Sequence, residues 1–325
     1  MRAASIPRRW YVIGDIHGCA LELQLLLRQL DPRGAVFVFV GDYIDRGPQS
    51  KEVIETILDL RRRHEVVALM GNHEAMLLDF LRDPTSLAGG LFVYNGGSCT
   101  LASYADQFGQ YAIPDEHLEF LRHLPLWYEM PGHLVVHAGL PEVPLEQLDP
   151  EVHRRDLLWS REMAHSRYRW AKRIIHGHRP AAQLDLRPNQ INVDTGCVFH
   201  GHLTALELPA LRHFSVPLQA RAAPAFLRDI RSSRRAVRFA GAVPVRIDVQ
   251  GHPLHFVTVN YSAVGMFVHC VSRYTIIRLR EAEHVRGVIG VPGIHELRFS
   301  GEVVRREERE DGVYYALTIA SCDPP

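Results

Sequence analysis

Aspartate, histidine and asparagine residues occur directly after five short apolar segments of the chain. They form five groups, at 14–18 (GDIHG), 41–47 (GDYIDRG), 71–74 (GNHE), 136–139 (VHAG) and 175–178 (IHGH). Their side chains offer both oxygen and nitrogen ligands, which suits Mn, Fe or Zn better than Ca or Mg. Two such ions about 3.5–4 Å apart can hold a phosphate and lower the pKa of a water molecule. The groups therefore predict a two-metal hydrolytic site.

The segments between these groups must position them. Continuous apolar runs at 10–13, 35–40 and 66–70 alternate with helical spacing at 21–30, 50–63 and 74–81. This alternation predicts a parallel sheet covered by helices on both faces. Functional residues gather just beyond the carboxyl ends of such strands, so the groups should meet there. We also expect strands at 134–136 and 173–175 and a hairpin within 191–209. The predicted class is an α/β domain with central β-sheets flanked by helices.

A lone aspartate or histidine after a strand is more often a turn residue or a helix cap than a ligand. Five groups in order, each at a strand end, argue against that explanation. Together they resemble the signature of the PPP-type metallophosphoesterases, which include Ser/Thr protein phosphatases and symmetrical diadenosine tetraphosphate hydrolases. The resemblance covers roughly 10–205, including 158–161 (LWSR), 194–196 (DTG) and 203–205 (LTA).

The resemblance implies a set of metal ligands. Asp15 and His17 would bind the first ion, and Asp42 would bridge both ions. The second ion would be bound by Asn72, His137 and His178. Manganese is the expected ion, with iron or zinc as alternatives. In the last group the family's ligand follows the glycine, which selects His178, although His176 stays open as an alternative.

The resemblance also implies catalytic roles. His73 would protonate the leaving oxygen, and Asp45 would hydrogen-bond to this histidine, fix its tautomer and raise its pKa. Arg46 and Arg161 would clamp the phosphate oxygens, because the planar guanidinium matches them. The implied reaction is direct in-line attack on phosphorus without a phosphoenzyme.

The pattern changes to short β-rich segments in the last part of the chain. They lie at 243–248, 254–259, 264–271, 274–279, 298–305 and 313–319, and they predict a small all-β barrel. The expected organisation is a catalytic domain at 1–215, a linker at 216–230 and the barrel at 231–325.

The barrel region resembles a PilZ domain over about 230–320. The resemblance depends on Arg234 and Arg238 in RxxxR spacing, followed by Asn260, Ser262 and Gly265 in an [DN]xSxxG pattern. It implies that these five residues bind cyclic di-GMP, with Arg235 as a weaker candidate. Arginines can pair with the phosphates of this ligand and stack on its guanines.

Composition restricts the remaining choices. The chain of 325 residues has 37 Lys+Arg and 37 Asp+Glu, and zero net charge argues against non-specific nucleic-acid binding. No apolar run approaches the length of about 20 residues that spans a bilayer. Five scattered cysteines without a CxxC pair predict reduced thiols and a cytoplasmic location.

The expected function is dephosphorylation of Ser/Thr phosphoproteins under control of cyclic di-GMP. The segment 92–105 favours this over the first alternative, a symmetrical diadenosine tetraphosphate hydrolase with the same sensor. A second alternative is a cyclic di-GMP-responsive adaptor with weak or no catalysis. The complete set of metal ligands argues against the adaptor.

Overall fold

The computed structural model describes residues 8–83, 91–105, 111–219, 239–240, 244–249, 252–262, 265–270, 279–280, 283–291, 295–309 and 312–323. The chain divides into two compact units. The first comprises Met1–Ala75, Ser103–Ala105 and Tyr111–Arg221, and the second comprises Met76–Ala102, Asp106–Gln110 and Ala222–Pro325. Within the described ranges, no helix has the length and apolar character needed to cross a membrane.

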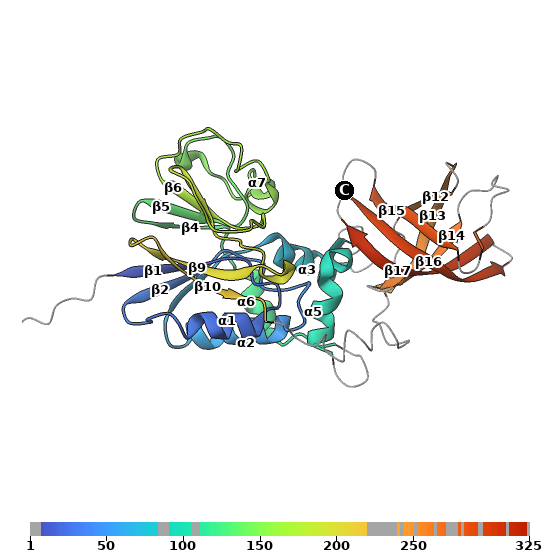
Figure 1. Cartoon of the computed structure of the whole chain (residues 1–325), viewed down its shortest axis with the longest axis horizontal. Helices are drawn as coiled ribbons and strands as arrows, with labels where there is room; N and C mark the ends of the chain where they lie inside the picture. Colours follow the sequence, from blue (N-terminus) through green and yellow to red (C-terminus); the bar gives the residue numbers. More distant parts are fainter. Residues whose placement is uncertain are drawn as a thin grey trace, which may run out of the picture. The chain divides into compact units, whose positions relative to one another are not determined.

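Two β-sheets form the centre of the first unit (Figure 1). One sheet has the order β10-β9-β1-β2-β3, with strands β1 (Arg9–Ile13), β2 (Ala35–Phe39), β3 (Glu65–Ala68), β9 (His202–Leu208) and β10 (Arg212–Pro217). The other has the order β4-β5-β6-β8-β7, with strands β4 (Trp127–Met130), β5 (His133–Val136), β6 (Arg173–His176), β7 (Asp185–Leu186) and β8 (Gln190–Asn192). Strands β1, β2 and β3 are parallel, as are β5, β6 and β8, so each parallel set ends at one edge of its sheet.

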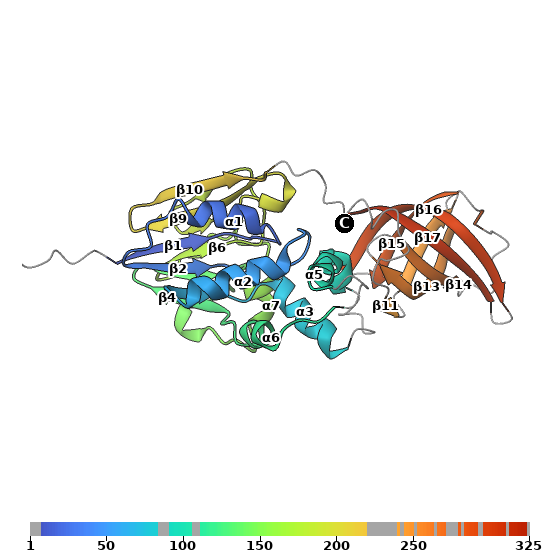
Figure 2. The same cartoon turned by 90° about the horizontal axis from the view of Figure 1, so that it is seen from below.

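The two sheets share one apolar core. Val36 and Val38 of β2 belong to the same buried cluster as Val135 of β5 and Ile175 of β6. The alternate residues of β2, Phe37 and Phe39, are also buried, because helices cover the other face of this sheet. Helix α1 (Ala20–Leu27) contacts β9, β10 and α2 (Ser50–Arg61), and Figure 2 shows both helices along that face. The α/β class predicted from the apolar runs is therefore confirmed.

Seven further helical segments are described. They are α3 (Asn72–Arg82), η1 (Val93–Gly97), α5 (Ser98–Ser103), α6 (Asp115–Arg122), η2 (Leu145–Gln147), α7 (Arg154–Trp159) and η3 (Cys197–Phe199). Helix α3 begins two residues before the expected helix at 74–81. This earlier start puts Asn72 and His73 in the first turn of the helix.

The hairpin expected within 191–209 is wrong. The chain crosses from one sheet to the other between β8 and β9, so these two strands do not pair. Gly196 at the crossing has a positive φ of 68°, and its N–H donates to Asp194 Oδ1 over 2.9 Å. The same turn residues would suit a hairpin, so local signals could not separate the two outcomes.

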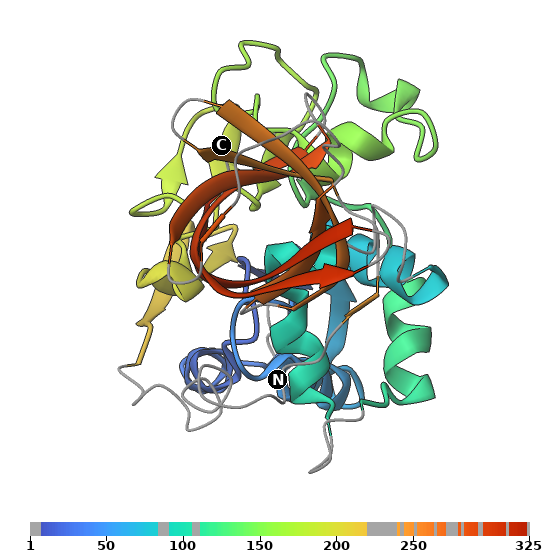
Figure 3. The same ribbon diagram turned by 90° about the vertical axis from the view of Figure 1, so that its right-hand side faces the viewer.

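The second unit contains a curled antiparallel sheet, seen end-on in Figure 3. Its strands follow the order β11-β13-β12-β15-β16-β17-β14, and pairing of β13 with β14 closes the sheet into a barrel. The strands are β11 (Phe239–Ala240), β12 (Pro244–Val249), β13 (His252–Ser262), β14 (Gly265–Cys270), β15 (His284–Val291), β16 (His295–Arg309) and β17 (Gly312–Asp323). Buried side chains such as Phe256, Val268 and Leu317 form its interior, so the predicted barrel is confirmed.

Strand boundaries in the barrel differ from expectation. The segments expected at 298–305 and 313–319 belong to longer strands, β16 and β17. Strand β15 was not expected, because Gly287 and Gly290 lower its strand propensity. The strand expected at 274–279 lies outside the described residues except for Leu279. The domain and linker boundaries stay predictions.

Candidate metal centre

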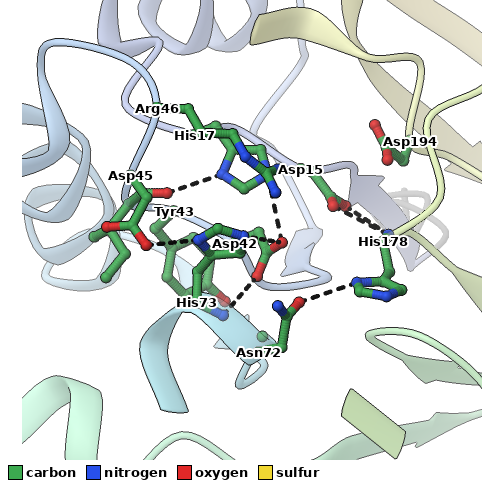
Figure 4. A network of polar contacts seen from close by, with 12 residues as sticks. Asp15, His17, Asp42, Tyr43, Asp45, Arg46, Asn72, His73, His178 and Asp194 are labelled. Carbon is green, nitrogen blue, oxygen red and sulfur yellow. Dashed lines mark hydrogen bonds and ion pairs between the residues drawn. The ribbon is translucent and has the colours of Figure 1, made fainter. Parts of the chain in front are cut away.

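The six predicted metal ligands come from both sheets of the first unit. Asp15 follows β1, Asp42 follows β2, and Asn72 opens α3 shortly after β3. His137 follows β5, and His178 lies two residues beyond β6. Figure 4 shows that several of these side chains converge, joined by a network of polar contacts. The arrangement follows from the topology, because parallel strands bring their carboxyl ends to one edge.

Asp42 lies between two groups of histidines. Its Oδ2 is 3.4 Å from His17 Nε2 and 3.9 Å from His73 Nε2, whereas its Oδ1 is 3.5 Å from His137 Nε2. The ligand atoms of His17, Asp42 and His73 lie within 4.8 Å of one another, as do those of Asp42, His137 and His178. One buried carboxylate thus offers one oxygen to each group, which is the geometry that a bridging ligand needs.

Backbone carbonyls fix the tautomers of two of these histidines. His17 Nδ1 is 2.9 Å from the carbonyl oxygen of Ile44, and His137 Nδ1 is 3.0 Å from that of Val40. A carbonyl can only accept, so each Nδ1 carries the proton and each neutral ring keeps a lone pair on Nε2. This is the orientation that a metal-binding histidine adopts when its other nitrogen is held.

The group around Asn72 fits a cation. Asn72 Oδ1 lies 2.9 Å from His137 Nε2 and 3.0 Å from His178 Nδ1, and the two ring nitrogens are 3.2 Å apart. The lone pair of His137 Nε2 faces an acceptor oxygen, which is unfavourable unless a positive charge lies between them. His178 Nε2 is buried and has no hydrogen-bond partner within the described residues. The donor set therefore fits a divalent metal ion.

Asp15 occupies a different position. Both of its carboxylate oxygens accept the backbone N–H of His178, at 3.0 and 3.2 Å, and it belongs to neither group of close ligand atoms. His176 also lies outside both groups, although it is buried at the end of β6. Between the two histidines that the sequence left open, the structure brings His178 to the ligand group.

Buried acidic groups crowd this site. Burial raises the pKa of Asp42 and of Asp194 to about 7 each. The pKa of Asp15 is well above its ordinary value, because of burial and then the charges of Asp194 and Asp42. These shifts mean that concentrated negative charge is unfavourable here without cations. A pair of divalent ions would stabilise the ionised carboxylates.

Asp45 and His73 form a buried pair, with Asp45 Oδ2 2.5 Å from His73 Nδ1. The predicted contact between Asp45 and His73 is therefore present, and it leaves Nε2 of the ring turned toward Asp42. The expected rise in the pKa of His73 is wrong. Burial lowers this pKa well below its usual value, and the charges of Arg46 and His17 lower it further.

The two predicted phosphate-binding arginines lie in different surroundings. Arg46 is partly buried, and its Nη1 donates to His17 Nε2 over 2.5 Å. Arg161 is exposed, and its charge lowers the pKa of His178, so it acts on the same site. The Arg161 carbonyl accepts a hydrogen bond of 3.1 Å from Arg179 Nη1. This places a third arginine, which the sequence did not single out, beside the predicted clamp.

Sequence reasoning assigned no role to Glu74 or Asp194. Glu74 is fully buried, and its Oε2 accepts the N–H groups of Gly71 and Asp42, each over 2.9 Å. Its Oε1 accepts the N–H of Tyr43 over 2.8 Å, so one carboxylate ties two ligand-bearing loops together. Burial raises the pKa of Glu74 to about 8. The sequence signal that could have identified Glu74 is an acidic residue in a helix that is otherwise apolar on one face.

The loops that carry the site are strained. His17, Asp42, Asp45, Arg46 and His178 have φ values of 47°, 54°, 72°, 65° and 65°. These are five of the seven non-glycine residues with positive φ in the described ranges. Residues with a Cβ rarely adopt this conformation, and such strain concentrates at functional sites.

The predicted cyclic di-GMP residues are only partly described. Arg234, Arg238 and the weaker candidate Arg235 lie outside the described residues. Asn260 and Ser262 lie on β13 and Gly265 on β14, with Ser262 paired to Gly265 across the hairpin. A β-bulge between Thr258 and Asn260 interrupts the pairing beside them. Their role in ligand binding stays a prediction.

Comparisons with known proteins give two family matches. Residues 8–205 match the calcineurin-like phosphoesterases, and residues 232–324 match the PilZ domain. A bis(5'-nucleosyl)-tetraphosphatase PrpE [asymmetrical] of Anoxybacillus flavithermus is 33% identical over 232 residues, covering 63% of this chain and 93% of that relative. The protein of the same name from Bacillus thuringiensis is 30% identical over 256 residues, covering 68% and 99%. A crystal structure described as a proposed diadenosine tetraphosphatase is 25% identical with a TM-score of 0.50, covering 67% and 97%.

Proposed function

The chain belongs to the calcineurin-like phosphoesterases and carries a C-terminal PilZ domain, and from this premise we propose that it hydrolyses dinucleoside polyphosphates under control of cyclic di-GMP. The observation that carries the hydrolytic part is Asp42, whose two oxygens face two separate histidine groups. The names of the relatives, which are matched over more than nine-tenths of their length, favour a dinucleotide over a phosphoprotein.

Two divalent ions, with manganese as the proposed metal, would polarise the phosphate and supply a water of lowered pKa as nucleophile. His17 and Asp42, whose ligand atoms lie close together, are the proposed ligands of one ion together with Asp15, which the family resemblance implies. Asp42, His137 and His178 are the proposed ligands of the other ion, together with Asn72 beside His137. The carbonyls of Ile44 and Val40 hold His17 and His137 in the tautomers that this binding requires.

His73 is the proposed proton donor to the leaving oxygen. Because Asp45 accepts a hydrogen bond from the Nδ1–H group of His73, Nε2 is the atom that must carry the transferred proton. The lowered pKa leaves this ring neutral in the free protein near pH 7. A phosphate brought beside it would add negative charge and raise that pKa, which couples protonation to substrate binding.

Arg46 and Arg161 are the proposed clamp for phosphate oxygens that do not contact the metals. A guanidinium can bind two oxygens of one phosphate through parallel hydrogen bonds. Arg179 beside Arg161 adds positive charge that a substrate with several phosphates could use. A phosphomonoester, with a single phosphate, would need less of this additional positive charge.

Initial rates with Mn²⁺ on diadenosine tetraphosphate and on a phosphoserine/phosphothreonine peptide test this function. Faster turnover of the dinucleotide is expected, and faster turnover of the peptide would establish the phosphoprotein assignment instead. Chromatography of the nucleotide products then separates symmetrical cleavage, which leaves two phosphates on each half, from asymmetrical cleavage, which leaves three and one. Equal, metal-independent background rates for wild type and Asp42→Asn would favour an adaptor without catalysis.

The proposed sensor role has its own test. Calorimetric titration of the full chain with cyclic di-GMP should give one binding isotherm in the wild type and none in the Arg234→Ala/Arg238→Ala variant. Arg231→Ala is the matched control, because it removes an arginine from the same basic run but outside the RxxxR spacing. Unaltered binding in the double variant would show that cyclic di-GMP binds at other residues.

A further inference from the structure

Phe199 is an exposed aromatic residue beside the candidate metal centre. Its side chain is 54% exposed, whereas most phenylalanines of the first unit's sheets and helices are buried. It ends η3, the short turn that follows Asp194, and so lies five positions after one of the acidic residues of the site. Phe199 lies in the connection between β8 and β9, where the chain crosses from one sheet to the other.

The turn that carries Phe199 is held firmly. The N–H groups of Phe199 and Gly201 both donate to the carbonyl of Gly196, each over 2.9 Å. Gly196 and His200 on either side have φ values of 68° and 67°. A Cβ on Gly201 would lie 2.0 Å from the Thr195 carbonyl oxygen, so only glycine fits there. The exposed ring is therefore presented by a defined backbone.

Phe199 also lies next to the proposed phosphate clamp. The Arg46 guanidinium carbon is 5.1 Å from the centre of the Phe199 ring, a cation–π contact. The same guanidinium donates to His17 Nε2 over 2.5 Å. One arginine thus connects the aromatic ring to a candidate metal ligand. This order of groups, metal ligand then cation then aromatic ring, is complementary to a phosphate joined to a planar base.

We propose that Phe199 is the surface on which a nucleobase of the substrate stacks while Arg46 binds an adjoining phosphate. The inference rests on the proposed dinucleotide function and names the residue that would recognise the nucleoside. Aromatic side chains bind bases of any sequence through their faces, and removing one such ring weakens binding measurably. An aliphatic side chain of a phosphopeptide would gain less from a flat ring bordered by a guanidinium.

The test compares two inhibitors that differ only by the base. AMP and ribose 5-phosphate are measured as competitive inhibitors of diadenosine tetraphosphate hydrolysis by the full, Mn²⁺-loaded chain. In the wild type AMP should bind more tightly. Phe199→Ala should reduce this advantage of AMP by roughly 5- to 150-fold, the range expected for one stacked base. Phe199→Trp should restore it.

Leu186→Ala is the matched control, because it removes an apolar side chain that is 46% exposed on the edge strand β7. It should leave the preference for AMP unchanged. If the wild type hydrolyses the dinucleotide but Phe199→Ala keeps the full preference, the stacking role is wrong and the proposed function survives. If the wild type does not hydrolyse the dinucleotide, the proposed function itself fails. A rise in KM for the phosphopeptide in Phe199→Ala, with no preference for AMP in the wild type, would assign the ring to a peptide.

Discussion

The first unit and the barrel hold their candidate sites in contrasting ways. The metal centre combines side chains from loops after β1, β2, β5 and β6 and from the start of α3, and most of them are buried. Those predicted ligand residues of the barrel that the structure describes lie on one hairpin, formed by β13 and β14. A site built from many strands depends on the whole fold, whereas a hairpin site depends on local pairing. Substitutions in the two units should therefore differ in their effects on hydrolysis, metal binding and cyclic di-GMP affinity.

The largest effect is expected at Asp42. Asn at this position keeps the shape but removes the charge shared by the two histidine groups. Because metal stabilisation of the transition state is worth several kcal/mol, the rate should fall by on the order of 10³-fold or more. Initial rates and Mn²⁺ content after dialysis measure this. A variant that retains both bound Mn²⁺ and rate would remove Asp42 from the bridging role.

A substitution of His73 should separate proton transfer from metal binding. His73→Gln should lower kcat by about 10²- to 10⁴-fold, the usual contribution of a general acid. The loss should be larger on a phosphoserine peptide, whose alkoxide leaving group needs a proton, than on p-nitrophenyl phosphate, whose leaving group does not. Mn²⁺ content should stay close to wild type. An equal loss on both substrates would contradict the role as proton donor.

The barrel should respond to Arg234→Ala in cyclic di-GMP affinity alone. Losing a charge-assisted hydrogen bond costs about 1.5–3 kcal/mol, so affinity should fall roughly 10- to 150-fold. The rate measured without cyclic di-GMP should not change. Calorimetry and initial rates on the same preparation measure both. A fall in the rate measured without cyclic di-GMP would contradict the expectation that this substitution affects ligand binding alone.

The smallest effect is expected at Glu74, which supports ligands without belonging to either ligand group. Gln can replace only part of a carboxylate that accepts three backbone N–H groups. Unfolding free energy should fall by about 1–3 kcal/mol, and metal affinity by about 10- to 100-fold. Thermal unfolding and Mn²⁺ titration measure the two effects. Unchanged metal affinity would limit Glu74 to a structural role.

The parts that the sequence predicts well are those set by local patterns. Apolar runs before glycine predict β1 and β2, and the histidines and acids after them predict the centre. The contacts of Glu74 could not be predicted, because its partners Asp42 and Tyr43 lie more than thirty positions away along the chain. Phe199 was missed because a sequence does not distinguish an exposed aromatic ring from a buried one. The pKa of His73 depends on burial, which only the fold determines.

The positive φ values in the metal-binding loops set stability against activity. A left-handed conformation costs a residue with a Cβ about 1–2 kcal/mol, and glycine avoids that cost. Arg46→Gly, at a partly exposed position with φ of 65°, relieves this strain but also removes the hydrogen bond to His17, so the melting temperature should change little while phosphate binding weakens. Scanning calorimetry and KM measured together check both effects. Glycine at these positions would relieve the strain but remove the contacts that build the metal centre. Any thermostable version of this protein must therefore obtain its stability from positions outside these loops.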